Sequence, residues 1–497
     1  MNVSFGPLST AVASRCNFVD GALAVTGGPH LSVRRPSDGI VYSETPDSSD
    51  SVVDDIVEGA HVAWRRSGWG TCAPRERARV LRRWADLIDG DVEVLGAIEA
   101  VGSTRPIGEV ATHDVPFTAE GIRFFAEWAD KIGGDFLATG ADRAGFVVAE
   151  PYGVIAAVTP WNFPLSTASW KCGAALAAGN AVILKPSEVT PFSALRLAEL
   201  AVAAGLPAGV LNVVNGRGTT AGRRLVQHPL ISKVTFTGST ATGSRIMTDA
   251  AAAGPKPVTL ELGGKSPQLV FADADLDMAA ACVARSVLGN AGQVCVAGTR
   301  LVIERRIADE FVGRVARLMA DINPGPTWER ETSYSPIISE DQGRRIEMVV
   351  AEALAAGAEC HVGGARIQSA SGGFFYCPTI LTNVKPGSVA ITEEIFGPVL
   401  TVQVFDDEDE GIRLADHPRY GLAAGIYTAD IGRAFRAMRR LAAGTVWINR
   451  YGRTYDFIVP TGGFKGSGFG KDLGRQSVEA NLRWKSVLLS IGEPVSA

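Results

Sequence analysis

The sequence has few cysteines and no long hydrophobic run. Seven cysteines occur among 497 residues, and no two of them form a CxxC pair, so neither a disulfide framework nor a cysteine-based metal site is expected. No uninterrupted apolar stretch reaches the roughly 18 residues that a membrane-spanning helix needs. The segment Met1 to Val19 lacks the cationic stretch and apolar run of a secretory signal. These absences predict a protein of a reducing, cytoplasmic compartment, with no membrane and no metal ion among its ligands.

The chain also lacks an excess of positive charge. Asp and Glu number 53 against 48 Lys and Arg, a net charge of −5, whereas proteins that bind nucleic acid normally carry a basic excess. Hydrophobic residues make up 46% and charged residues 20%, ordinary values that exclude a disordered chain. Glycine is abundant instead, at 56 residues or about 11%, against about 7% on average. An α/β protein of enzyme size is therefore expected.

Apolar periodicity divides the chain into a helical first part and a strand–helix series. Residues 50–100 predict two amphipathic helices, with the Arg side chains of the second facing water, and a third helix is predicted at about 116–131. Strands then alternate with helices such as 194–204, which indicates a parallel sheet built from crossover units. The strands are predicted at 147–149, 154–158, 181–184, 210–214, 233–236 and 257–262.

A second alternating series begins near Pro267. Its presence, without any short internal repeat, predicts two α/β domains. Its strands are predicted at 301–303, 375–380, 399–405 and 424–428, and its helices at 275–288, 308–320 and 341–356.

Two glycine-rich loops compete as the phosphate-binding turn of a dinucleotide site. Gly216-Arg-Gly218-Thr-Thr-Ala221 follows an apolar run and matches a dinucleotide fingerprint, which is an unspecific signal in a glycine-rich chain. Phe236-Thr-Gly238-Ser239-Thr-Ala-Thr-Gly243 also follows a strand and leads into a helix beginning near Gly238. Amides at a helix start attract phosphate. Both loops are also compatible with ordinary strand-to-helix turns.

Cys295 lies in a loop of small and polar residues, Asn290-Ala-Gly-Gln-Val-Cys295-Val-Ala-Gly-Thr-Arg300. A single cysteine is more often a small buried apolar residue than a nucleophile. A thiolate nucleophile needs a base, an oxyanion site and exclusion of water, and no local cluster supplies them. The loop by itself leaves both interpretations open.

Six separated segments carry more information together than apart. They are Pro160-Trp-Asn162-Phe-Pro164, Lys185-Pro-Ser-Glu188, Glu261-Leu-Gly-Gly-Lys-Ser266, the Cys295 loop, Glu393-Glu-Ile-Phe-Gly-Pro398 and Pro460-Thr-Gly-Gly-Phe-Lys-Gly-Ser-Gly468. In order and spacing this set resembles the aldehyde dehydrogenase superfamily, in its NAD(P)-dependent, hydrolytic branch. The resemblance extends from about Asn17 to Gly492.

The resemblance implies an α/β fold with a Rossmann-like cofactor domain, an α/β catalytic domain and a small β oligomerisation element. Residues 17–133 and 152–262 would form the NAD-binding domain, and residues 263–470 the catalytic domain. Residues 134–151 and 471–497 would form the oligomerisation element of a homodimer or homotetramer. Residues 1–16 are expected to be flexible.

The resemblance also assigns catalytic groups. Cys295 would attack the aldehyde to form a thiohemiacetal, whose oxyanion the Asn162 amide and the Cys295 backbone N–H would stabilise. After hydride transfer to NAD, Glu261 would activate the water that hydrolyses the thioester. Lys171 matches another family position near the active site. Without the resemblance, Asn162 is a turn residue, Glu261 a solvated strand-end carboxylate, and Lys171, beside Trp170, a helix residue whose charged end reaches solvent.

NAD is the cofactor that the resemblance implies. Lys185 and Glu188 would meet the adenosine ribose, where a carboxylate accepts bonds from both hydroxyls and repels a 2′-phosphate. The second glycine loop would hold the pyrophosphate, which leaves the first loop near the adenine at most. Glu394 would bind the nicotinamide ribose, and Phe396 would pack beside the ring. The full predicted set is Thr159, Pro160, Trp161, Lys185, Glu188, Gly218, Phe236, Gly238, Ser239, Gly243, Leu262, Glu394 and Phe396.

The resemblance implies a small-molecule aldehyde as the substrate. Asp114, near Phe117, and Asp456 are predicted to meet an amine at the tunnel mouth, although both aspartates could be solvated surface charges. The run Asp114-Val-Pro116 and the Cys295 loop resemble the branch that acts on γ-aminobutyraldehyde-type substrates, and aromatic walls suit apolar or cationic chains. The predicted tunnel residues are Phe117, Phe163, Trp170 and residues of the loop 451–459, among them Tyr455.

Other observations keep alternatives open. Arg450 and Arg453 bring positive charge to the loop that holds Tyr455 and Asp456, and could favour a carboxylated semialdehyde as the substrate. Thr461 replaces a usual Phe of the tunnel, which puts a standard aliphatic specificity in doubt. A CoA-acylating dehydrogenase would not need Glu261 as a hydrolytic base. A binding protein that has lost activity would not need the intact set of Cys295, Glu261 and Asn162.

Overall fold

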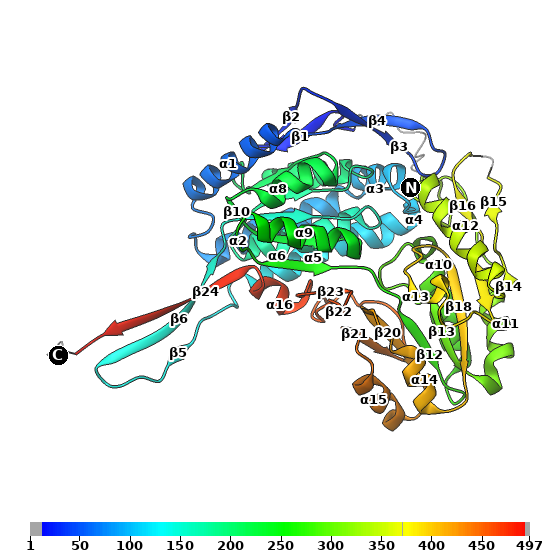
Figure 1. Cartoon of the computed structure of the whole chain (residues 1–497). Coiled ribbons are helices and arrows are strands. Elements are labelled where there is room, and N and C mark those ends of the chain that lie inside the picture. Colours follow the sequence, from blue (N-terminus) through cyan, green and yellow to red (C-terminus); the bar gives the residue numbers. More distant parts are fainter. Residues whose placement is uncertain (1–11, 370, 493–497) are drawn as a thin grey trace.

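The computed structural model describes residues 12–369 and 371–492, which form two α/β bodies and a projecting arm (Figure 1). Most of the segment predicted as flexible, residues 1–16, lies outside the described residues. Strand β1 (Cys16–Val19) begins one residue before the predicted start of the ordered region at Asn17.

Eight strands form the sheet of the first body, in the order β2-β1-β9-β8-β7-β10-β11-β23. The five strands from β9 to β11 are parallel, and antiparallel strands complete both edges. Every residue of β7 and β8 is buried, as expected for parallel strands that are covered on both faces. Chain order reverses between β7 and β10, the type of switch point at which α/β sheets bind ligands. The bounds are β2 (Ala22–Val25), β7 (Val154–Val158), β8 (Ala181–Lys185), β9 (Leu211–Val213), β10 (Ile231–Thr237), β11 (Val258–Glu261) and β23 (Gly468–Phe469).

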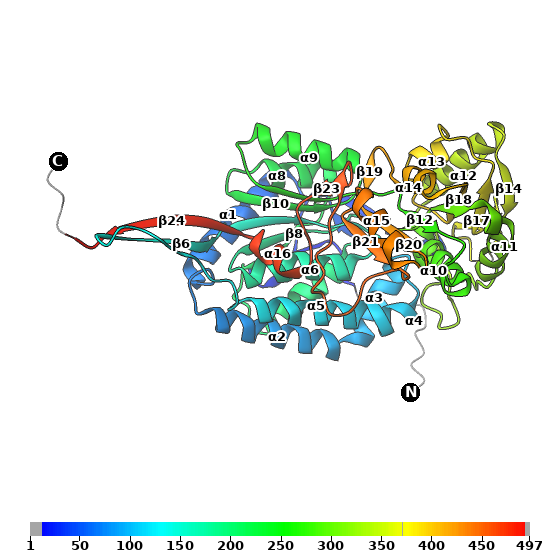
Figure 2. The same cartoon turned by 90° about the horizontal axis from the view of Figure 1, so that it is seen from below.

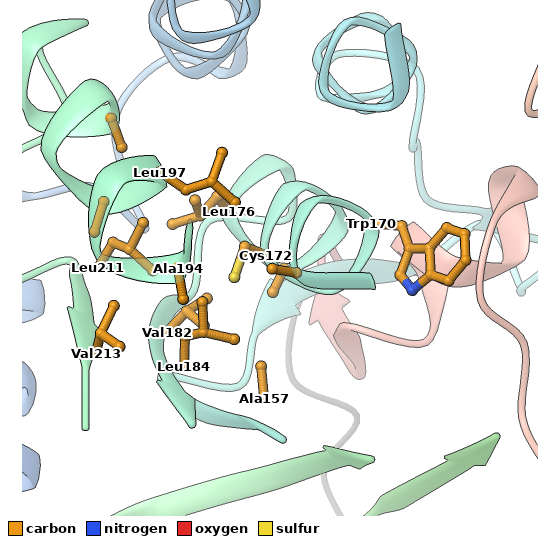
Figure 3. Close-up of a cluster of buried hydrophobic side chains, with 14 of the residues drawn as sticks. Ala157, Trp170, Cys172, Leu176, Val182, Leu184, Ala194, Leu197, Leu211 and Val213 are labelled. Atoms are coloured by element: carbon orange, nitrogen blue, oxygen red, sulfur yellow. The ribbon is translucent and has the colours of Figure 1, made fainter. Parts of the chain in front are cut away.

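Helices cover both faces of this sheet. Helix α6 is buried along all 14 residues, because strands lie on one side of it and helices on the other. In Figure 3, Cys172 and Leu176 of α6 and Leu197 of α7 lie over Val182 and Leu184 of β8. The helices of this body are α1 (Asp50–Ser67), α2 (Pro74–Gly90), α3 (Val92–Gly102), α4 (Ile107–Glu109), α5 (Val115–Trp128), α6 (Pro164–Ala177), α7 (Phe192–Ala203), α8 (Arg223–Gln227) and α9 (Thr240–Ala252), with π-helical turns η1 (Val110–Asp114) and η2 (Gly218–Gly222).

Seven strands form the sheet of the second body, in the order β14-β17-β18-β13-β12-β20-β21. All neighbours are parallel except β14 and β17. The strands are β12 (Pro267–Val270), β13 (Arg300–Glu304), β14 (Glu359–Val362), β17 (Thr379–Thr382), β18 (Val399–Phe405), β20 (Ala423–Tyr427) and β21 (Thr445–Ile448). The helices are α10 (Leu276–Leu288), η3 (Gly289–Gly292), η4 (Arg305–Ile307), α11 (Ala308–Met319), α12 (Glu340–Ala355), α13 (Val389–Thr392), α14 (Glu408–Ala415) and α15 (Ile431–Arg440).

A three-stranded antiparallel sheet projects from the first body as an arm, as both views show (Figures 1 and 2). Strand β24 (Leu482–Ser490) pairs with β6 (Arg143–Pro151) along its full length, and β5 (Phe136–Leu137) adds a short edge. Large apolar side chains such as Phe136 and Leu488 are exposed on it. The remaining elements are β3 (His30–Arg34), β4 (Val41–Pro46), β15 (Arg366–Ile367), β16 (Phe375–Tyr376), β19 (Tyr420–Gly421), β22 (Phe464–Lys465) and α16 (Gly474–Glu479).

Two expectations about elements are wrong. Residues 50–100 hold three helices, because the second ends at Gly90 and a third begins at Val92. The strand predicted at 375–380 is two strands in different sheets, β16 and β17, since Pro378 lacks the N–H that a continuous strand would need. The prediction for the Arg side chains between the apolar positions of α2 is confirmed, because Arg79, Arg82 and Arg83 are exposed. Arg77, which precedes them, is buried and donates to the carbonyl of Ala177.

None of the helices in the described ranges combines the length and hydrophobicity that a bilayer span requires.

Candidate active site

Cys295 lies in the second body, in the loop between η3 and β13. Asn290 and Ala291 take left-handed φ angles of 49° and 50°, and Gly292 follows with 71°. A Cβ on Gly292 would fall 2.2 Å from the carbonyl oxygen of Gly397, so glycine is required there. Three consecutive left-handed residues turn the chain sharply after α10. The turn places Cys295 at the boundary between the two bodies.

Asn162, the predicted oxyanion donor, contacts this loop from the first body. Its Nδ2 donates to the carbonyl oxygen of Gln293 at 2.9 Å, and its own carbonyl oxygen accepts from Asn290 Nδ2 at 3.1 Å. Asn290 Oδ1 accepts in turn from Thr104 Oγ1 at 2.7 Å. All four residues are buried. The role of Asn290 was not predicted from the sequence. The one local signal for it is that asparagine tolerates the left-handed backbone conformation that this turn requires.

Glu261 ends β11 on the same boundary. It is 7% exposed, and its Oε1 has no hydrogen-bond partner among the described residues, so it is not a solvated strand-end carboxylate. Burial is the main cause that raises the pKa of Glu261 well above its usual value, and the nearby Asp472 raises it further. Lys171 and Arg453 act in the opposite direction. A buried carboxyl with a raised pKa and a free oxygen suits proton transfer near neutral pH.

Lys171 is fully buried. Its position on the helix suggested that the charged end reaches solvent, and the structure shows that it does not. Its Nζ donates to Asp472 Oδ2 at 2.9 Å and to Thr235 Oγ1 at 3.0 Å. The Lys171 ammonium and the Asp472 carboxylate both act on the pKa of Glu261. Lys171 therefore lies behind Glu261 as part of a buried charged group, and the sequence contained no local signal for Asp472.

Burial also raises the pKa of the Cys295 thiol, which is the largest of its causes. The negative charges of Glu394 and Glu261 raise the pKa further, whereas Arg453 lowers it. A thiol with a raised pKa rests in the neutral form and needs a base before it can attack a carbonyl. In the part of the chain that the structure describes, no group of three or more His, Cys, Asp or Glu side chains is placed to hold a metal ion.

A cleft of about 860 Å³ opens at the switch point of the first sheet. The start of α9 faces it, where Ser239 caps the helix by accepting from the Thr242 N–H at 3.2 Å. A Cβ on Gly238 would fall 2.4 Å from the Phe236 ring, so glycine at position 238 lets the backbone lie against this ring. The cleft is lined by nine of the predicted cofactor residues, namely Thr159, Pro160, Trp161, Lys185, Glu188, Gly218, Phe236, Gly238 and Ser239.

These features suit an extended dinucleotide. Open helix-start amides receive phosphate, and the Glu188 carboxylate at the cleft wall can accept from ribose hydroxyls. Lys185 Nζ lies 3.5 Å from Glu188 Oε2 and also donates to the Pro186 carbonyl. Three arginines of the cleft were not predicted as cofactor residues, although one of them, Arg217, belongs to the first glycine-rich loop. Arg217, Arg223 and Arg245 line the cleft.

Four predicted cofactor residues lie elsewhere. A Cβ on Gly243 would fall 2.7 Å from Leu262 Cδ2, so these two residues pack against each other where α9 meets β11. Glu394 Oε1 accepts from the Gly264 N–H at 3.0 Å, and burial raises the Glu394 pKa to about 7. Phe396 packs edge-on against Trp161, with 5.3 Å between ring centroids. The structure thus brings Glu394 and Phe396 to the end of the cleft nearest Cys295.

The predicted tunnel residues form part of an aromatic cluster. Phe117 lies 6.3 Å from Trp170, 5.6 Å from Tyr455 and 4.4 Å from Phe457 between ring centroids. Phe457 belongs to the loop 451–459, which was predicted to contribute to the tunnel. Phe163 stands apart from these contacts, beneath the Arg105 guanidinium at 4.7 Å.

The prediction that Asp114 meets a substrate amine is wrong. Asp114 is 1% exposed and accepts from Arg105 Nε at 2.8 Å and Nη2 at 3.2 Å. Such a bidentate buried pair neutralises the carboxylate inside the protein. Asp114 is not a surface charge either. Asp456 is exposed and accepts from Thr454 Oγ1 at 2.6 Å.

The sequence and fold of this chain are similar to those of one family of known proteins. The aldehyde dehydrogenase family profile matches residues 25–487. The NADP/NAD-dependent aldehyde dehydrogenase PuuC of Escherichia coli (strain K12) is 41% identical over 441 residues, which cover 88% of each chain.

Solved structures agree over nearly the whole chain. A γ-glutamyl-γ-aminobutyraldehyde dehydrogenase from Burkholderia cenocepacia J2315 superposes with a TM-score of 0.94 at 41% identity, covering 97% of this chain and 98% of the other. An indole-3-acetaldehyde dehydrogenase complexed with NAD+ gives a TM-score of 0.94 at 38% identity, covering 96% of both chains. With this fold, this profile match and these relatives, the chain belongs to the aldehyde dehydrogenase family.

Proposed function

We propose that this chain oxidises an aldehyde to a carboxylic acid with NAD+, through a thioester on Cys295 that a Glu261-activated water hydrolyses. The observation that supports it best is the meeting of three separated segments at one boundary. The Asn162 amide bonds to the Cys295 loop, and Glu261 lies near enough to act on the pKa of the Cys295 thiol. The test is NADH absorbance with a panel of small aldehydes, and no NADH with any of them would refute the proposal.

Each residue then has a chemical task. The Cys295 sulfur bonds to the aldehyde carbon, and the Asn162 Nδ2–H and the Cys295 N–H donate to the resulting oxyanion, an effect worth roughly 3–4 kcal/mol per donor in comparable sites. Bound NAD+ would supply the acceptor for the hydride that this carbon releases. Glu261 next takes a proton from water as the water attacks the thioester, which releases the acid and returns the thiol.

The cofactor residues would hold NAD in the switch-point cleft. The Ser239 N–H would bind the pyrophosphate, whereas the Gly238 N–H already donates to the carbonyl oxygen of Glu261 at 3.0 Å. Glu188 would bind the adenosine ribose, and Glu394 the second ribose. Ser239 Oγ already caps α9, so its backbone N–H is the group left for phosphate. Gly243 and Leu262 support the start of α9 by packing.

Replacing Glu188 by Ala is expected to narrow the preference for NAD over NADP by about 10-fold, because a charge-assisted hydrogen bond to ribose and a repulsion of the 2′-phosphate are both lost. The measurement is kcat/KM for both cofactors. Glu199→Ala is the matched control, since Glu199 pairs with Arg196 outside the cleft. A wild-type enzyme that prefers NADP would contradict the assignment.

The pKa of Glu261 predicts the pH dependence. Glu261 works as a base only when deprotonated, and its pKa is raised, so the rate of deacylation should rise with pH through that pKa. Asp472→Asn removes a negative charge that raises the Glu261 pKa, and the acid limb of kcat should therefore move to lower pH. Asp406→Asn, an exposed carboxylate paired with Arg305, is the control. If the acid limb of the kcat–pH profile stays in place in Asp472→Asn, or moves to higher pH, then Asp472 does not raise the pKa of Glu261.

The substrate class remains a proposal with two candidates. The relative named for γ-glutamyl-γ-aminobutyraldehyde supports a nitrogen-containing aldehyde, as the sequence analysis favoured. The loss of Asp114 as an amine ligand removes one support for that class. CoA acylation fits less well, because the buried base Glu261 serves hydrolysis.

We also propose an oligomeric state and a cellular compartment for this chain. The exposed apolar side chains of the arm suit a contact with another copy, in a homodimer or homotetramer. Residues 134–151 and the strand β24 contribute to the arm. The cysteines at all seven positions are free, which is consistent with a cytoplasmic compartment.

A further inference from the structure

One positive charge at the active site has no acidic partner among the described residues. Arg453 Nη2 donates to Thr461 Oγ1 at 3.2 Å, and the guanidinium lies over the Trp170 ring, 5.3 Å from its centroid. No ion pair of Arg453 occurs within residues 12–369 and 371–492. The side chain is solvent-accessible. Its stacking on Trp170 and its bond to Thr461 hold the guanidinium in a fixed place, with most of its N–H donors available.

The charge of Arg453 acts on the reacting groups themselves. It lowers the pKa of the Cys295 thiol, of the Glu261 carboxyl and of the Tyr451 hydroxyl. These three groups come from three different segments, so their common neighbour faces the space between them. A guanidinium in that position produces a positive potential where the aldehyde reacts.

A cavity of about 180 Å³ lies beside Arg453. Trp447 lines it and also packs in the apolar cluster that includes Cys295. Thr461, another lining residue, is paired through its backbone with Asp472. A Cβ on the next residue, Gly462, would fall 3.0 Å from Glu261 Oε1. Trp447 and the segment at Thr461 therefore connect this cavity to the surroundings of Cys295 and Glu261, although neither of these two residues lines it.

Of the two aspartates predicted to meet an amine, only one lines this cavity. Asp114 pairs with Arg105 inside the first body. Asp456 lines the cavity but accepts from Thr454 Oγ1. Arg450, a second positive lining residue, donates to the carbonyl of Gly452. With Arg450 and Arg453 against Asp456, the charged side chains that line the cavity carry a net positive charge.

We infer that Arg453 binds a carboxylate on the substrate, so that the preferred aldehydes are short semialdehydes whose carboxylate lies a few atoms from the carbonyl. The planar fork of a guanidinium matches a carboxylate with two parallel hydrogen bonds, and Thr461 Oγ1 holds the fork in place. This inference rests on the proposed dehydrogenase function. It assigns the specificity of the same site to Arg453.

The test compares kcat/KM for succinic semialdehyde, 4-aminobutanal and butanal, which have chains of equal length. Wild-type enzyme should prefer succinic semialdehyde to butanal. Arg453→Met should lower the ratio of these two kcat/KM values about 10-fold, the loss expected for a hydrogen-bonded charge pair, whatever its effect on the thiol common to both reactions. Arg453→Lys should restore part of the ratio, because it keeps the charge without the fork.

Arg450→Met is the matched control, as a neighbouring arginine of the same cavity, and the preference for succinic semialdehyde should persist in it. Butanal oxidation without any preference for succinic semialdehyde would overturn the inference and leave the dehydrogenase function standing. A preference that survives Arg453→Met or disappears in Arg450→Met would also overturn it. A higher kcat/KM for 4-aminobutanal would assign the site to amines. If no aldehyde yields NADH, the proposed function itself fails.

Discussion

Cys295→Ala is expected to lower the steady-state rate of NADH formation on the order of 10⁴-fold or more, since removal of a catalytic nucleophile has effects of this size or larger. Without the sulfur no thiohemiacetal forms, and the aldehyde carbon keeps its trigonal geometry and cannot release a hydride. The measurement is NADH absorbance at saturating aldehyde, together with binding of NAD+ by fluorescence or calorimetry. NAD+ affinity should change little, because the cleft is lined by residues of the first body.

Cys360→Ala provides the control for this experiment. Cys360 is an exposed free cysteine at the edge strand β14, in the second body and away from the boundary. Its replacement should leave the rate near that of the wild type. Dehydrogenase turnover that persists in Cys295→Ala would show that another residue is the nucleophile, and a loss of NAD+ binding would indicate that the substitution disturbed the fold.

Glu261→Gln is expected to separate the two halves of the reaction. The amide fills the same space but cannot take a proton from water, so hydrolysis of the thioester should slow by about 10²–10⁴-fold, the usual contribution of a general base. Formation of the thioester needs no water, so a pre-steady-state burst of NADH close to one equivalent per active site should precede a slow steady rate. Rapid mixing with absorbance detection measures both phases.

Glu340→Gln is the matched control, because Glu340 is a half-exposed carboxylate that pairs with Arg366 far from Cys295. It should show the wild-type time course. Absence of the NADH burst in Glu261→Gln would mean that Glu261 acts before hydride transfer, for example in removing the proton from the Cys295 thiol. That outcome is chemically reasonable, because the pKa of the Cys295 thiol is raised and the thiol needs a base. It would assign Glu261 to the first half of the reaction.

Local patterns predicted the buried strands well. The ranges 154–158 and 399–405 match β7 and β18 to the residue, because parallel strands covered on both faces are short continuous apolar runs. Errors arose where a single residue interrupts a pattern. Pro378 divides one predicted strand into β16 and β17. The end of α2 and the start of α3 lie two residues apart, and the two predicted helices left no room for a third.

The candidate site came from ordered motifs rather than from local chemistry. Cys295, Asn162 and Glu261 lie far apart in the chain, and no pattern around any one of them indicates the other two. Their motifs could be matched because the family's segments keep their order. Asp472 and Asn290 were missed because their side chains act through partners distant in sequence. The family resemblance therefore named the reacting groups and left out the residues that hold them.

Charges show most clearly what the tertiary structure adds. The sequence by itself determined the α/β class, the family and the residue types that can react, because these depend on periodicity and on motif order. Only the tertiary structure decided which charges are available to a ligand. Asp114 is neutralised by Arg105, Lys171 is buried against Asp472, and Arg453 stays accessible beside Cys295 and Glu261. The physical reason is that the effect of a charge depends on its distance to other charges and on its burial, and folding sets both between residues that are remote in sequence.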